Sequence, residues 1–175
     1  TQNPIEQSGT FPLPEAQLDR FLLYIKVDYP TLEEERSILE NTTGKKGEAI
    51  KNVIEGNKIL EAQKLVREVH INSELIDWVS RIVRATRPGQ KENDFVNEWV
   101  RWGAGPRAGQ AMILTAKARA LLHGNFSVTQ DDIRHVAYPV LRHRILMNFK
   151  AEAERVHPDD VTKHLLQNIA MSKSL

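Results

Sequence analysis

Three polar side chains in this sequence have the chemistry to bind or sense a phosphate group: Asn3, Arg20 and Arg107. Asn3 precedes the turn-forming Pro4, and an amide at the end of a strand can hydrogen-bond a phosphate or orient a water molecule. The guanidinium of Arg20 stays charged and offers a planar fork of donors. Arg107 follows Pro106 in the first turn of an expected helix, where a cation opposes the helix dipole while the helix N-terminus attracts anions.

Each of these residues also has a purely structural interpretation. Asn3 can simply begin an Asn-Pro turn. Arg20 can form an ion pair with Asp19 or Glu15 of its own helix, or lie free on the surface. Arg107 can be an exposed arginine whose aliphatic stem covers apolar surface. Taken one at a time, the residue types leave both interpretations open.

Length and composition predict an ordinary globular chain. Its 175 residues are 41% hydrophobic and 27% charged, which suits one domain, or a small piece plus a domain. The net charge of +1 creates no overall field toward nucleic acid or an anionic membrane, and no apolar run reaches the length of a membrane span. Because cysteine is absent, disulfides, zinc–thiolate sites and a thiol nucleophile are excluded. A reducing compartment is compatible with this, and we expect a cytoplasmic protein.

Periodicity and capping signals predict a mainly α-helical chain. In the first half, helices are expected over 15–22, from the Thr31–Glu34 capping box to about 41, over 59–69 and after the cap Asn72. In the second half, a helix is expected from Pro106 to about 123, where Gly124 closes it, another after Thr129 and Asp132, which Pro139 ends or kinks, and a last one from Pro158 onward. Short strands are expected over 23–27 and 96–102. The body from residue 31 onward reads as a helical bundle. The first thirty residues carry strand and loop that need partner strands from upstream, and we interpret the chain as a piece of a longer protein.

Read together, the three phosphate-binding candidates fit one known pattern. Residues 1–7 (TQNPIEQ) and 9–21 (GTFPLPEAQLDRF) closely resemble the stretch of MoxR-type AAA+ ATPases from sensor 1 to the arginine finger. Residues 103–108 (GAGPRA) are similar to the sensor 2 motif of that family, and residues 29–36 resemble the turn into its helical lid. The likeness is spread over essentially the whole chain, although the helical middle matches in layout more than in letters.

The resemblance assigns a role to each candidate. Asn3 matches sensor 1, Arg20 matches the finger that reaches a neighbouring subunit's ATP, and Arg107 matches sensor 2. It implies that residues 1–30 are the end of an α/β ATPase core and that residues 31–175 are the lid. For the full-length protein it implies ATP and Mg²⁺, hexameric rings, partners with a von Willebrand factor A domain, and a chaperone-like motor that remodels or assembles other proteins. No G-x-x-x-x-G-K-[ST] motif occurs in these residues, so we expect this chain alone not to hydrolyse ATP.

One alternative is a helical module that binds nucleic acid. Residues 101–150 carry eight Lys and Arg against two Asp, and Trp99 and Trp102 could stack on bases. The competing interpretation is a solvated basic face, with the two tryptophans packing the lid against the core. Salt-dependent binding of a non-specific duplex would favour the nucleic-acid module. We expect no metal site, since His135 and His143 lie eight residues apart without a carboxylate pair.

Overall fold

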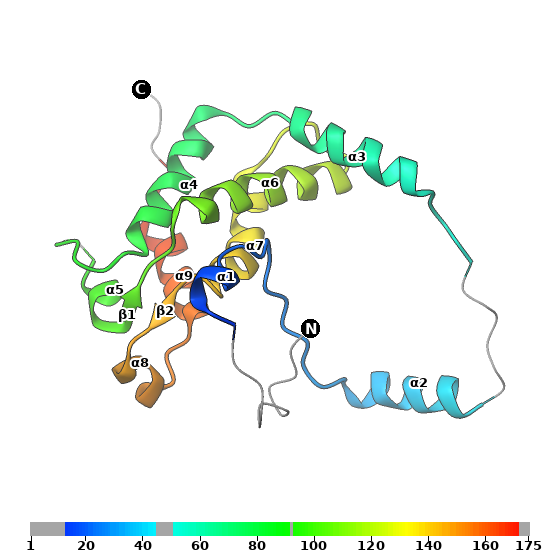
Figure 1. Cartoon of the computed structure of the whole chain (residues 1–175), viewed down its shortest axis with the longest axis horizontal. Coiled ribbons are helices and arrows are strands. Elements are labelled where there is room, and N and C mark those ends of the chain that lie inside the picture. The colour runs from blue at the N-terminus through cyan, green and yellow to red at the C-terminus, as the bar shows by residue number, and fades with distance from the viewer. Residues whose placement is uncertain (1–12, 45–50, 92, 172–175) are drawn as a thin grey trace. The chain divides into compact units, whose positions relative to one another are not determined.

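The computed structural model describes residues 13–44, 51–91 and 93–171 (Figure 1). Within these ranges the chain is mainly α-helical, which confirms the predicted fold class of a helical lid after a short core remnant. The elements are α1 (Glu15–Leu18), α2 (Leu32–Thr43), α3 (Gly56–Glu68), α4 (Ser73–Ala85), α5 (Asp94–Trp99), β1 (Val100–Trp102), α6 (Pro106–Leu122), α7 (Gln130–Leu141), β2 (Leu146–Met147), α8 (Phe149–Glu154) and α9 (Pro158–Asn168). None of the helices in the described ranges has the length and apolar character that crossing a membrane requires.

The described residues fall into two compact units. Residues up to Tyr24 group with those from Val66 onward, and Ile25–Leu65 form the second unit. In the second unit, α2 begins with the capping box of Thr31 and Glu34 that the sequence predicted. Neither α2 nor α3 buries a residue in the described structure. The expected boundary between residues 30 and 31 concerns the whole protein and stays a prediction.

The core of the first unit lies among α4, α6, α7 and α9. Helix α6 contributes mainly small side chains to it, because Ala108, Ala111, Ala116 and Ala120 are all buried. Small residues allow neighbouring helices to approach closely, and larger side chains then fill the remaining space. The largest fully buried side chains include Trp78, Ile82, Met112, Ile133, Leu141 and Leu165.

Several helix ends confirm the predicted signals. Asn72 caps α4 by accepting a hydrogen bond from the backbone N–H of Leu75 at 2.8 Å. Pro106 occupies the first turn of α6, and Gly124 follows its end with a φ of 74°, a left-handed conformation that favours glycine. Pro139 lies in the last turn of α7, which ends two residues later at Leu141. This position agrees with the inability of proline to continue a helix.

Two of the predicted strands need correction. Residues 23–27 form no strand, and Val27 is 90% exposed. Alternating apolar residues make a strand only where another strand pairs with them. The segment 96–102 is a strand only over β1, which pairs antiparallel with β2. Asn93 caps α5 by accepting from the N–H of Val96, so the segment begins as a helix instead. The short helix α8 was not predicted.

The spacing of apolar residues after Pro106 predicts a buried line of Ala111, Leu114, Ala118 and Leu121, and this prediction was partly wrong. Ala111 is buried as expected, but Leu114, Ala118 and Leu121 are only half-buried. The helix instead buries Ala108, Met112, Ala116 and Ala120 besides Ala111. Spacing alone does not show which side chains meet a neighbouring helix, where close contact favours small residues.

A buried carboxylate fixes the start of α7. Asp132 accepts hydrogen bonds from the backbone N–H and the hydroxyl of Thr129, at 2.8 and 2.7 Å, and forms an ion pair with Arg119. Burial raises the pKa of Asp132, but the bonds from Thr129 and Arg119 outweigh it, so that this pKa lies below its ordinary value of 3.8. The predicted capping signal of Thr129 and Asp132 is therefore confirmed and extends to an ion pair between α6 and α7.

Replacing Asp132 with Asn should lower the free energy of unfolding by about 1–3 kcal/mol at neutral pH, since hydrogen bonds to a charged group are lost. Because the pKa is lower in the folded state, the unfolded chain binds the proton more readily. The stabilisation is present above the unfolded pKa and disappears as the pH falls through the folded pKa. Urea denaturation at pH 7 and below the ordinary Asp pKa should show the gap between wild type and variant narrowing in acid. A gap of equal size at both pH values would contradict this assignment.

Candidate functional site

The segment that carries Arg20 is shorter in helix than the sequence predicted. Helix α1 ends at Leu18 rather than at residue 22, and a turn follows in which the N–H of Arg20 donates to the carbonyl of Gln17 at 3.1 Å and the N–H of Phe21 donates to that of Leu18 at 3.1 Å. After Leu18 the buried side chain of Arg144 binds the backbone carbonyls of Asp19, Phe21 and Leu22, which are therefore not available for a continued helix. Arg20 therefore stands in a turn with a defined backbone.

The guanidinium of Arg20 is exposed and, within the described ranges, has no hydrogen-bond or ion-pair partner. Of the two structural alternatives for this residue, the ion pair with Asp19 or Glu15 is wrong, whereas an arginine free on the surface is compatible with the structure. Asp19 accepts instead from Arg144 and Arg107, and Glu15 accepts from Arg101 at 2.8 Å. The neighbouring carboxylates are thus used by other arginines, and Arg20 is left available for a ligand.

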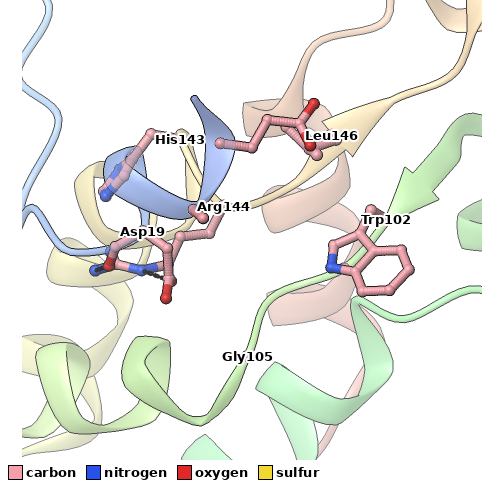
Figure 2. A pocket seen from close by; sticks show the side chains of 9 residues that line it. Asp19, Trp102, Gly105, His143, Arg144 and Leu146 are labelled. Atoms are coloured by element: carbon pink, nitrogen blue, oxygen red, sulfur yellow. Dashed lines mark hydrogen bonds and ion pairs between the residues drawn. The ribbon is translucent and has the colours of Figure 1, made fainter. Parts of the chain in front are cut away.

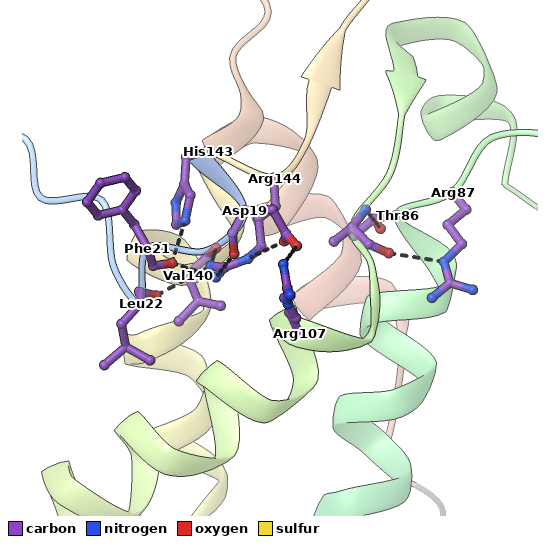
Figure 3. Close-up of polar contacts among 10 residues, drawn as sticks. Asp19, Phe21, Leu22, Thr86, Arg87, Arg107, Val140, His143 and Arg144 are labelled. Carbon is purple, nitrogen blue, oxygen red and sulfur yellow. Dashed lines mark hydrogen bonds and ion pairs between the residues drawn. The ribbon is translucent and has the colours of Figure 1, made fainter. Parts of the chain in front are cut away.

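Buried hydrogen bonds hold the loop before α6 in place (Figure 3). The hydroxyl of Thr86 accepts from the N–H of Ala104 at 2.8 Å and donates to the carbonyl of Val83 at 2.7 Å. The side chain of Arg87 donates to the carbonyl of Ala104 at 3.1 Å. A side chain at Gly103 would collide with the backbone of Thr86 and Arg87, so the close approach requires glycine at this position. These contacts fix the direction in which α6 begins.

Arg107 lies in the first turn of α6, as predicted, and about half of its side chain (52%) is exposed. The helix begins after Gly105 without a side-chain cap and without an acidic residue in its first turn. The nearest carboxylate contact is from Arg107 to Asp19, at 3.5 Å. An uncapped helix N-terminus with a cation in its first turn suits an anionic ligand.

Arg20 and Arg107 lie on one cavity of about 340 Å³. Its lining residues are Asp19, Arg20, Leu22, Arg107, Gln110, Ala111, Leu114 and Arg144. The charged groups on this surface are three guanidinium groups and one carboxylate, so that the cavity has an excess of positive charge. The structure thus brings together two of the three predicted phosphate-binding residues, whereas Asn3 lies outside the described residues.

Arg144 is the most heavily hydrogen-bonded side chain at this site, and sequence reasoning did not predict its role (Figure 3). Its side chain is 3% exposed. Nε donates to Oδ1 of Asp19 at 3.0 Å, and Nη2 donates to the carbonyls of Asp19 and Phe21 at 2.9 and 2.6 Å. Nη1 donates to the carbonyls of Leu22 and Val140 at 3.3 and 2.6 Å. Burial lowers the pKa of Arg144, while its bonds to Asp19 act in the opposite direction.

The two residues before Arg144 bind the same segment. His143 donates from Nε2 to the carbonyl of Phe21 at 3.1 Å. Burial lowers the pKa of His143, although this hydrogen bond opposes the effect, so the ring is neutral at pH 7. Arg142 donates to the carbonyl of Tyr24 at 3.0 Å and pairs with Asp159. The signal in the sequence is an Arg-His-Arg triplet between two apolar stretches, but it does not indicate what the triplet binds.

A second cavity, of about 310 Å³, shares Asp19 and Arg144 with the first (Figure 2). Trp102, which is 69% exposed, lines it together with Glu15 and Ala16 of α1. Trp99 instead lies against other side chains, with Phe95 edge-on and the Nζ of Lys150 over its ring at 4.8 Å. The two neighbouring tryptophans therefore have different surroundings and do not form one stacking surface.

The basic stretch 101–150 is largely neutralised. Six of its eight cations contact carboxylates: Arg101, Arg107, Arg119, Arg142, Arg144 and Lys150. The other two, Lys117 and Arg134, donate to the carbonyls of Arg67 and Leu166. This pairing weakens the alternative of a nucleic-acid-binding face, which requires cations that are free to contact phosphates. In the described ranges no cluster of three or more His, Asp or Glu side chains is arranged to hold a metal ion.

Comparison with known proteins agrees with this arrangement. Residues 93–165 match the AAA lid domain family, and residues 1–23 match the ATPase family associated with various cellular activities (AAA). Chaperone MoxR1 of Mycobacterium tuberculosis is 40% identical over 98% of this chain and 45% of its own length. Protein MoxR of Paracoccus denitrificans is 31% identical over 88% of this chain and 49% of its own length.

A solved structure has the same fold. The crystal structure of a putative ATPase from Cytophaga hutchinsonii superposes with a TM-score of 0.92 at 32% identity, over 98% of this chain and 53% of the other. The two family matches, the relatives and the fold agree, and the chain belongs to the MoxR-type AAA+ ATPases. It spans about half the length of the relatives that it matches.

Replacing Thr86 with Val should lower the free energy of unfolding by about 1–3 kcal/mol, because the buried N–H of Ala104 loses its acceptor in an otherwise similar shape. Thr86→Ser keeps the hydroxyl and serves as the matched control, with a loss of about 0.8 kcal/mol for one methyl group. Denaturant-induced unfolding measures both. Equal stability of Thr86→Val and wild type would show that this hydrogen bond does not hold the loop.

Proposed function

We propose that this chain is the sensor and lid portion of an ATPase that couples ATP binding and hydrolysis to the remodelling or assembly of partner proteins. In this proposal Asn3 is sensor 1, Arg20 is the arginine finger and Arg107 is sensor 2. Residues 1–30 belong to the ATPase core, and residues 31–175 form the lid. Our proposal includes cytoplasmic hexameric rings and partners that carry a von Willebrand factor A domain, as the family resemblance implies.

The observation that carries the proposal is that Arg20 combines an exposed guanidinium with a fixed backbone. Its guanidinium is exposed and has no partner in the described ranges, while its backbone is held by hydrogen bonds on both sides. A finger needs this combination, because a charge that must reach a neighbouring subunit has to be free and yet precisely placed. Arg107 lies on the same cavity and has a weak contact to Asp19 that a phosphate can replace.

The residues of the cavity fit a polyphosphate. Arg20 and Arg107 supply two guanidinium forks to the cavity, and Arg107 lies in the first turn of the uncapped helix α6, where the helix dipole favours an anion. ATP supplies the phosphoryl group that is transferred to water, with Mg²⁺ in the full-length protein. The part of this chain is to stabilise charge through Arg20 and to report the nucleotide through Arg107. We expect the isolated chain to show no ATP turnover, and the full-length protein to show it.

In the full-length protein, Arg20→Ala should lower the kcat for ATP by roughly 10³-fold or more, since a finger stabilises charge that develops in the transition state. Nucleotide binding should stay largely intact, which equilibrium binding of a fluorescent ATP analogue measures. Arg36→Ala is the matched control, because the side chain of Arg36 is exposed and pairs with Glu40 of its own helix. Wild-type turnover by the Arg20 variant would exclude the finger role.

Arg107→Ala should weaken the coupling between nucleotide and assembly. The fold should not suffer, because the substitution removes a cation from the first turn of a helix, where it costs about 0.3–1 kcal/mol. Sedimentation with and without ATP would show a smaller nucleotide-dependent change in assembly size than wild type shows. Arg107→Lys, which keeps the charge, should retain part of the response. Unchanged assembly and unchanged turnover in Arg107→Ala would count against a sensor.

A further inference from the structure

The two residues that flank Arg20 are bound by one buried side chain. Arg144 donates to the carbonyls of Asp19 and Phe21, which stand directly before and after Arg20. It also binds the carboxylate of Asp19 and the carbonyl of Leu22. Four of its five hydrogen bonds therefore reach the short segment that carries Arg20. The fifth ties Arg144 to the carbonyl of Val140 in α7, the helix that ends three residues earlier.

The bonding of Arg144 leaves no donor for a ligand. A guanidinium has five N–H groups, and the five acceptors of Arg144 use all of them. Although Arg144 lines the cavity with Arg20 and Arg107, it cannot bind a phosphate without giving up one of these bonds. This distinguishes it from Arg20, whose guanidinium has no partner in the described ranges.

Burying a charge is costly unless hydrogen bonds replace the lost water, and an apolar side chain would pack the end of α7 without that cost. Apart from the local bond to Val140, the donors of Arg144 instead point at the carboxylate of Asp19 and at backbone carbonyls 122 to 125 residues earlier in the chain. Such a set of bonds fixes the position and orientation of a short turn more narrowly than apolar contact does. The turn that it fixes is the one that presents Arg20.

We propose that Arg144 is a positioning residue for Arg20, which holds the turn of residues 19–22 so that the Arg20 guanidinium points into the inter-subunit site. This inference rests on the proposed role of Arg20 as a finger. Arg144 acts through Arg20 and not on the nucleotide. Lysine cannot replace it, because one ammonium with three donors does not reach five acceptors arranged around a planar fork.

A double-mutant cycle on ATP turnover by the full-length protein tests the proposal. Arg144→Lys keeps the positive charge and should lower kcat by roughly 10- to 100-fold, the effect of misplacing a reacting group by about 1 Å. The KM for ATP should stay close to wild type, since Arg144 does not contact the nucleotide. In the Arg20→Ala background, Arg144→Lys should lower kcat no further, because the group that it positions is gone.

The results separate this inference from the proposed function. If Arg20→Ala retains wild-type turnover, the finger role fails and the positioning role fails with it. If Arg20→Ala collapses turnover but Arg144→Lys leaves kcat at the wild-type level, or lowers it equally in both backgrounds, the finger role stands and the positioning role is overturned. A raised KM with unchanged kcat would also overturn it, since that pattern indicates a nucleotide-binding residue.

A loss of fold is distinguished by a control and by a milder variant. Arg119→Lys weakens another partly buried Arg–Asp pair of the lid, away from residues 19–24, and should retain wild-type kcat below its melting temperature. If Arg144→Lys does not fold, Asp19→Asn replaces it in the cycle, because it removes one charge from the contact and leaves the carbonyl acceptors in place. It should lower kcat several-fold in the wild-type background and not at all with Arg20→Ala. Equal losses in both backgrounds would overturn the proposal.

Discussion

The burial of one guanidinium, that of Arg144, is the constraint on which the candidate site depends. A charged side chain that is 3% exposed is tolerated only when every donor finds an acceptor, and here each of the five does. Four of these acceptors belong to the segment that follows α1. The donors of Arg144, just after α7, and the acceptors of residues 19–22 are therefore satisfied only when the two segments lie together.

A second set of bonds sets the position of Arg107 independently. Thr86 and Arg87, at the end of α4, hold Ala104, and Gly103 allows the two backbones to approach. Helix α6 then begins in a fixed direction with an uncapped N-terminus. The cavity with Arg20 and Arg107 thus forms where two rigid contacts meet, one from α7 and one from α4. The backbone at both arginines is thus held in place, which in the proposed function lowers the cost of positioning them for a ligand.

The sequence predicted local features better than distant ones. The starts of α4, α6 and α7 followed from Asn72, Pro106 and Thr129, because a cap acts within one helical turn. The half-buried strand over residues 23–27 was wrong, since its formation depends on a neighbouring strand and not on the alternation itself.

The residues of the candidate site likewise differ in whether local sequence could predict them. Arg20 and Arg107 were predicted as candidates from their motifs and lie on one cavity, whereas Arg144 was missed because its partners lie about 120 residues earlier in the chain. An Arg-His-Arg triplet has an ordinary composition for a helix end, where cations are favoured by the dipole. Only the folded chain shows that one of its members is buried and faces the turn with Arg20.

The carboxylate of Asp19 explains why one arginine of the cavity is committed and another is free. Asp19 accepts from the buried Arg144 at 3.0 Å, but its contact with the half-exposed Arg107 is 3.5 Å long. An exposed ion pair of that length is worth about 0–1 kcal/mol, whereas a buried charge strongly requires its partner. In the proposed function, Asp19 therefore stays with Arg144 when an anion enters, and Arg107 exchanges its weak contact for a phosphate. On that proposal the buried pair orients the turn, and the weak pair leaves Arg107 free to respond to the nucleotide.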